Sequence, residues 1–124
     1  MQGEGALVGE SQHFLRLAVC PFRCLYCDTE DSWTAATAWR FTPGAAVPGV
    51  TLDWEDRPNP VGVEQAMRVL DELDTACGEM RPVSVTGGEP LVHTDFLGVL
   101  LPKIRDSGRP VRIETAGAHG SALA

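Results

Sequence analysis

Apolar side chains recur along two stretches of this chain at the 3.6-residue spacing of an amphipathic helix. The first runs from Val61 to Cys77, with Gly78 as its stop signal. The second runs from a cap at Thr94 or Asp95 to about Asp106, with Gly108 as its C-cap. Pro102 lies inside the second pattern and is expected to kink or split that helix.

Three short apolar runs predict strands before, between and after these helices. They cover His13 to Val19, Pro82 to Thr86 and Pro110 to Thr115. The order strand, helix, strand, helix, strand predicts an α/β fold whose parallel strands are joined by right-handed crossovers. In such folds the chemistry gathers where the strands end. A cysteine-rich loop, the segment GGEP and the segment ETAG follow the three strands in turn.

The remaining stretches carry weaker patterns. Ser32 to Phe41 is interpreted as a short helix or an irregular segment. Thr42 to Pro60 has four prolines and two glycines, which predicts a loop. The 124 residues fit one domain spanning 1–124, without internal repeats.

Charge and hydropathy exclude some classes of protein. The net charge of −7 argues against a nucleic-acid binder, because phosphate contacts need clustered Lys and Arg. It also argues against adhesion to anionic membranes. No apolar run approaches the roughly 20 residues of a membrane span, and no signal peptide precedes the first strand. We therefore expect a cytoplasmic protein.

Three of the four cysteines lie within eight residues, in the segment CPFRCLYCDT. In the cytosol such clusters more often bind metal or carry redox chemistry than form disulfides. Zinc sites usually take four ligands, and the histidines are scattered. Three thiolates on one loop suit a cubane iron–sulfur cluster with one iron left open. A zinc site completed by a histidine or water is the alternative.

The spacing C-x-x-x-C-x-aromatic-C, with Tyr26 as the aromatic residue, resembles the signature of radical S-adenosylmethionine enzymes. GGEP at Gly87 to Pro90 is similar to their GGE segment. The resemblance implies a 4Fe-4S cluster on Cys20, Cys24 and Cys27 whose open iron chelates S-adenosylmethionine. Cleavage of that cofactor then yields a 5′-deoxyadenosyl radical. The same resemblance assigns S-adenosylmethionine contacts to a set of four residues. These are Tyr26, Gly87, Gly88 and Glu89.

Three further segments, QGEG at Gln2 to Gly5, FLRL at Phe14 to Leu17 and CDT at Cys27 to Thr29, resemble the 7-carboxy-7-deazaguanine synthase family. That family converts 6-carboxy-5,6,7,8-tetrahydropterin to 7-carboxy-7-deazaguanine with loss of ammonia. The resemblance implies that Thr29 ligates Mg²⁺ beside the substrate. It also implies a set of substrate-binding residues. These are Gln2, Gly3, Glu4, Arg16, Gly88 and Glu114.

ETAG resembles the family's ETNG, with Ala116 where the family usually has Asn. Members carry a strand before QGEG and continue beyond ETNG. The resemblance therefore implies a partial (β/α) barrel, truncated at both ends, from a fragment or a mis-called reading frame. It also implies a homodimer that receives electrons from a flavodoxin or ferredoxin.

Two alternatives remain: another small radical S-adenosylmethionine protein, such as a glycyl-radical activase, and a non-catalytic zinc-binding module. Several other residues are expected to have structural rather than functional roles. Cys77 is expected in the core, and Asp28 is expected to cap its loop by accepting backbone N–H bonds. The acidic residues of the first helix are expected on its solvated face. These are Glu64, Asp71, Glu72 and Asp74.

Overall fold

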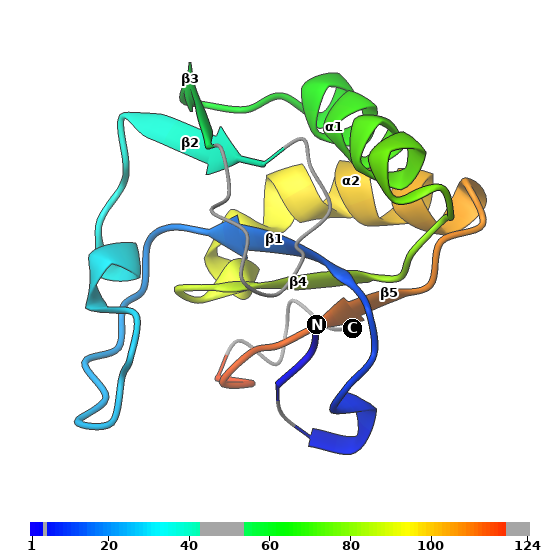
Figure 1. Cartoon of the computed structure of the whole chain (residues 1–124). Helices are drawn as coiled ribbons and strands as arrows, with labels where there is room; N and C mark the ends of the chain where they lie inside the picture. The colour runs from blue at the N-terminus through cyan, green and yellow to red at the C-terminus, as the bar shows by residue number, and fades with distance from the viewer. Residues whose placement is uncertain (4, 43–53, 119–124) are drawn as a thin grey trace.

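A parallel sheet of three strands organises the molecule. The computed structural model describes residues 1–3, 5–42 and 54–118. The sheet holds β1 (His13–Leu17), β4 (Val83–Gly87) and β5 (Val111–Ile113) in the order β1-β4-β5. Helices α1 (Val63–Cys77) and α2 (Thr94–Asp106) connect the strands and lie together on one face of the sheet (Figure 1). The predicted α/β class with parallel strands is confirmed.

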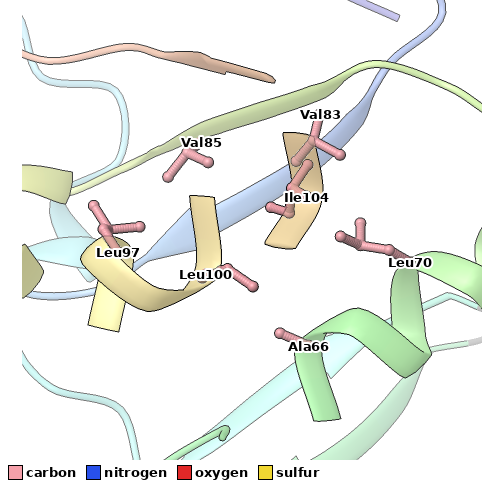
Figure 2. Close-up of a cluster of buried hydrophobic side chains, with 7 residues drawn as sticks. All are labelled: Ala66, Leu70, Val83, Val85, Leu97, Leu100 and Ile104. Carbon is pink, nitrogen blue, oxygen red and sulfur yellow. The ribbon is translucent and has the colours of Figure 1, made fainter. Parts of the chain in front are cut away.

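The core lies between β4 and the two helices. Val83 and Val85 are fully buried because alternate side chains of a strand share one face. Figure 2 shows both valines facing the apolar sides of α1 and α2. The helical members of this cluster follow the predicted 3.6-residue spacing. They are Ala66, Leu70, Leu97, Leu100 and Ile104.

The opposite face of the sheet is polar. Ser84 and Thr86 alternate with the two core valines and therefore point away from the helices. In the register of β1 and β4, Phe14 pairs with Ser84 and Arg16 with Thr86. The candidate site is built on this face.

The ends of the helices fit the predictions in part. Gly78 ends α1 in the left-handed conformation, with φ 73°. Helix α2 begins at Thr94, but its N-cap is His93, and a short 3-10 helix, η3 (Pro90–His93), precedes it. Pro102 does not split α2, which runs unbroken. Buried leucine and isoleucine side chains on both sides of the proline hold the helix against the sheet.

Two strands lie where none was predicted. Strands β2 (Ala38–Phe41) and β3 (Glu55–Pro58) pair antiparallel, so the interpretations of 32–41 and 42–60 were wrong over these residues. A 3-10 helix, η2 (Glu30–Trp33), precedes β2. Positions 43–53 of the predicted loop lie outside the described residues. The Trp39 and Phe41 rings lie 5.5 Å apart, and the Arg57 guanidinium lies 4.4 Å from the Phe41 ring centre. The Arg57 contact crosses from β3 to β2 and so stabilises the strand pair. Proline is tolerated in an edge strand such as β3.

Asp74 is not on the solvated face of α1, contrary to the prediction. Its side chain is 12% exposed. Its carboxylate accepts hydrogen bonds from His13 Nε2 at 2.7 Å, Arg109 Nε at 2.8 Å and the Arg81 N–H at 3.0 Å. Arg109, 4% exposed, also pairs with Asp71 at 2.6 Å. The cluster joins α1 to segments at the amino-terminal end of the sheet, away from the cysteine loop.

The other acidic residues of α1 and its cysteine are less buried. Glu64, Asp71 and Glu72 stay exposed as predicted. Cys77 is half-buried rather than fully buried. Within 1–3, 5–42 and 54–118, no helix has the length and apolar character needed to cross a membrane.

Candidate functional site

The loops that follow the three parallel strands meet at one edge of the sheet. The Gly88 N–H donates to Leu17 O at 2.7 Å, and the Glu89 N–H donates to Val19 O at 3.0 Å. The Glu114 N–H donates to Val85 O at 2.9 Å. The cysteine loop, GGEP and ETAG therefore lie together, as the strand order predicts.

The three clustered cysteines line one pocket of about 340 Å³. Cys20, Cys24 and Cys27 are free thiols. Tyr26, Gly88 and Glu89, which the sequence assigns to S-adenosylmethionine, line the same pocket. Thr115 of ETAG lines this pocket as well, and two residues that the sequence did not single out, Phe22 and Trp33, complete its wall.

The donor set of this pocket suits a cubane cluster. A cubane with one open iron takes three thiolates, each on a different iron, and three free thiols line the pocket. A structural zinc site takes four ligands, commonly cysteines with histidines. Among the described residues that line this pocket there is no histidine and no fourth cysteine.

A second pocket, of about 520 Å³, gathers most of the predicted substrate residues. Gln2, Gly3, Arg16 and Glu114 line it together with Thr29. Gly88 lines the first pocket instead, and Glu4 lies outside the described residues. Asp28 and Glu114 line both pockets. The two pockets therefore adjoin.

Glu114 lies where the two pockets adjoin and is held by hydrogen bonds from two directions. Its Oε1 accepts hydrogen bonds from Gln2 Nε2 at 2.5 Å and from Ser84 Oγ at 2.8 Å. Burial by itself would raise the pKa of Glu114, but hydrogen bonds from Ser84, Gln2 and Thr86 and the charge of Arg16 outweigh it and lower the pKa. The carboxylate therefore stays ionised at neutral pH, next to the guanidinium of Arg16.

Asp28 does not cap its loop in the way the sequence suggested. Within the part of the chain that the structure describes, its exposed carboxylate accepts no hydrogen bond and forms no ion pair. It lies instead where the two pockets adjoin.

The structure gives Gly87 and Gly88 a role that does not depend on a ligand. A Cβ at Gly87 would collide with the Leu17 backbone, and φ there is 119°. A Cβ at Gly88 would collide with the Val19 backbone and lie 2.9 Å from Ser32 O. Gly87 is therefore needed for β4 to lie against the end of β1, and Gly88 for the segment after β4 to approach the start of the cysteine loop. The predicted contact of both glycines with S-adenosylmethionine stays a prediction.

We expect Gly88→Ala to push the cysteine loop away from β4. Overpacking of this kind costs about 1–3 kcal/mol of unfolding free energy. Gly98→Ala is the matched control, because nothing lies within 4 Å of a Cβ there and Ala favours a helix by about 0.5–1 kcal/mol. Urea unfolding followed by circular dichroism checks both. Equal stability of Gly88→Ala and the parent chain would show that the loop is not packed as described.

The Glu89 carboxylate is buried and accepts hydrogen bonds from neighbouring segments of the chain. It is 1% exposed. Its Oε1 accepts from the Thr115 hydroxyl at 2.6 Å and the Leu91 N–H at 3.0 Å, and its Oε2 accepts from the Ala116 N–H at 2.9 Å. The side chain therefore joins GGEP to ETAG. Its predicted contact with S-adenosylmethionine stays a prediction.

Two polar strand residues of the site were missed from sequence. Ser84 donates to Glu114, and Thr86 lines the second pocket. The alternation of valine with hydroxyl residues in PVSVT could have identified them, because it places both hydroxyls on the face away from the core. The Nε2–H of His93 donates to Ala18 O at 2.6 Å, just before the cysteine loop.

Comparison with known proteins relates the chain to radical S-adenosylmethionine enzymes. Residues 16–122 match the model of the Radical SAM superfamily. Curated proteins named 7-carboxy-7-deazaguanine synthase are similar to the chain. That of Thermococcus kodakarensis is 34% identical over 116 residues, which cover 92% of this chain and 44% of the relative. Those of Methanopyrus kandleri and Geobacter sulfurreducens are 38% and 36% identical, covering 93% and 99% of this chain.

The chain spans less than half the length of these relatives, since it covers 44% of the second and 47% of the third. No solved structure matches it significantly. The family match extends over more than half of the chain and includes the cysteine loop, GGEP and ETAG. The chain belongs to the radical S-adenosylmethionine superfamily.

Proposed function

We propose that this chain forms the cluster-binding and substrate-binding part of a 7-carboxy-7-deazaguanine synthase. In this proposal it acts on 6-carboxy-5,6,7,8-tetrahydropterin and releases ammonia. The observation that carries the proposal is the meeting of Gln2, Arg16 and Glu114 in a pocket that adjoins the three cysteines. The names of the curated relatives support it.

The two pockets suggest a division of roles. Cys20, Cys24 and Cys27 would hold a 4Fe-4S cluster, with S-adenosylmethionine in the first pocket. When bound, that pair supplies the radical that abstracts a hydrogen atom from the substrate. The three-stranded sheet would be part of a (β/α) barrel, with its polar face turned inward.

The residues of the second pocket suit a pterin that carries a carboxylate. The guanidinium of Arg16 offers a planar fork for the substrate carboxylate. The ionised Glu114 offers an acceptor for the donor edge of the ring, and Gln2 donates to that carboxylate and so would orient it toward the substrate. Ser84 and Thr86 hold Glu114 in place from the central strand.

Binding of the substrate tests this assignment. Arg16→Gln and Glu114→Gln should each weaken the affinity for 6-carboxytetrahydropterin by about tenfold or more, because each removes a charge-assisted hydrogen bond. Arg105→Gln, an exposed change on α2, is the control. Calorimetric titration of the reconstituted chain measures the affinities. Unchanged affinity in both variants would exclude this pocket as the pterin site.

Thr29 is proposed as a ligand of Mg²⁺ in the second pocket, where its hydroxyl lies 3.9 Å from Cys27 Sγ. A hard cation suits a hydroxyl combined with substrate oxygens and waters. Thr29→Ala should remove the Mg²⁺ dependence of substrate binding and leave the cluster spectrum unchanged. Titrations with and without Mg²⁺ check this. Loss of the cluster in this variant would show that Thr29 has a different role.

The remaining assignments concern partners and location. By the same resemblance, we propose a homodimer in the cytoplasm that is reduced by a flavodoxin or ferredoxin.

A further inference from the structure

We propose that Arg23 is a positioning residue that fixes Cys20 for cluster binding. Arg23 immediately precedes Cys24 in the segment CPFRCLYC. Its Nη1 donates to the carbonyl of Cys20 at 2.7 Å and to the carbonyl of Phe22 at 2.6 Å. These bonds hold the first turn of the loop closed.

Trp33 completes this arrangement from the other side. The Arg23 guanidinium lies 4.7 Å from the centre of the Trp33 ring, a cation–π contact. The backbone carbonyl of Trp33 accepts from the Cys20 N–H at 3.3 Å. Both backbone polar groups of Cys20 are therefore bound, one by Arg23 and one by Trp33.

The middle of the loop gains little from apolar burial. Leu25 and Tyr26 are 104% and 89% exposed, so apolar burial does not hold this part of the chain. The Cys27 N–H donates to Cys24 O at 3.1 Å, a contact local to the second half of the loop. A polar clamp at Cys20 is thus the means by which the first thiol keeps its place relative to the other two.

A guanidinium is required because the clamp uses two properties together. Its planar group can donate to two carbonyls while its face lies on an aromatic ring. A lysine ammonium keeps the charge, but it lacks the planar fork. Arg23→Lys should therefore only partly replace the arginine, and Arg23→Met should remove the clamp.

Thiol reactivity of the full chain before reconstitution tests the inference. Arg23→Met should speed alkylation of Cys20 by about tenfold, as expected for the loss of charge-assisted hydrogen bonds. Cys24, which is already exposed, should change little, and the half-buried Cys77 on α1 should not change. Arg23→Lys should give an intermediate rate at Cys20. Mass spectrometry of timed samples gives the rate at each cysteine.

Arg68→Met is the matched control, since Arg68 is exposed on α1 and makes no hydrogen bond or ion pair within the described residues. An unchanged Cys20 rate in Arg23→Met would overturn the proposal. An equal acceleration of alkylation at Cys77 in Arg23→Met would also overturn it, because it would indicate general loosening of the fold. A parent-like Cys20 rate in Arg23→Lys would overturn it too, because it would show that the planar group is not needed.

The inference rests on the proposed function in one respect, namely that the three cysteines hold a cluster. A second measurement therefore follows reconstitution with iron and sulfide. The cluster of Arg23→Met should be lost to a chelator faster than that of the parent chain. Failure of the parent chain to form a cluster would contradict the proposed function, whereas the alkylation rates test Arg23 alone.

Discussion

Asp74→Ala is expected to lower the free energy of unfolding by about 3–5 kcal/mol, the range for breaking a buried ion pair from one side. Total stabilities of domains are about 5–15 kcal/mol, so this loss is severe. The change removes the partner of His13 and leaves the buried guanidinium of Arg109 with Asp71 as its remaining acidic partner. Urea unfolding at neutral pH, followed by circular dichroism, measures the loss.

Asp106→Ala is the control for this experiment. Asp106 is exposed near the end of α2 and pairs with Arg105 at 3.3 Å, so its removal should change stability by less than about 1 kcal/mol. Similar losses for the two variants would mean that the cluster around Asp74 does not hold α1 to the sheet.

The same cluster predicts a dependence of stability on pH. Burial alone would raise the pKa of Asp74, but hydrogen bonds from His13, the Arg81 N–H and Arg109 and the charge of Arg109 outweigh it and lower the pKa. A carboxyl whose pKa is lower in the folded than in the unfolded chain stabilises the folded chain at pH values above the unfolded pKa of about 3.9. This stabilisation is lost as the pH falls through the pKa of the folded chain. The stability difference between the parent chain and Asp74→Asn should therefore shrink as the pH falls below about 4. A difference that grows there would contradict the assignment.

Cys27→Ser is expected to abolish the iron–sulfur cluster. A cubane with one open iron uses all three thiolates that line this pocket, so no further cysteine among the described lining residues can replace a lost one. After anaerobic reconstitution, the parent chain should hold about four irons and show the broad visible absorption of thiolate-bound clusters. The variant should lose both, as should Cys20→Ser and Cys24→Ser.

Cys77→Ser provides the control, because Cys77 lies on α1 and is absent from the residues around the cysteine pocket. It should keep the full iron content. A parent chain that stays colourless and holds one zinc ion would instead favour the zinc-binding alternative. Loss of the cluster in Cys77→Ser would show that the three-cysteine assignment is wrong.

The elements that sequence predicted well are those whose signal is local. The two helices bury residues at 3.6-residue spacing against one strand, and that spacing is visible in a short window. The pairing of β2 with β3 was missed, because it joins residues 14 to 20 positions apart and prolines in and near β3 indicated a loop. Its stability comes from the cross-strand partners of Trp39 and Phe41, which no local pattern reveals.

The candidate site, too, could be predicted from the sequence only in part. The sequence predicted that the cysteine loop, GGEP and ETAG meet, because parallel strands bring the segments after them to one edge of the sheet. At the opposite end of the sheet, the burial of Asp74 could not be predicted, since its partners His13 and Arg109 are 61 and 35 residues away in the sequence. The packing requirement at Gly88 was equally hidden, because the atoms that exclude a side chain belong to Val19 and Ser32.

The central claim is that the three cysteines hold a cluster with an iron open to S-adenosylmethionine. The most direct test is electron paramagnetic resonance of the reconstituted, reduced chain, recorded with and without S-adenosylmethionine. We predict a cluster signal whose shape changes when S-adenosylmethionine binds, because the cofactor becomes a ligand of the open iron. A cluster signal that is identical in the two samples would contradict the claim.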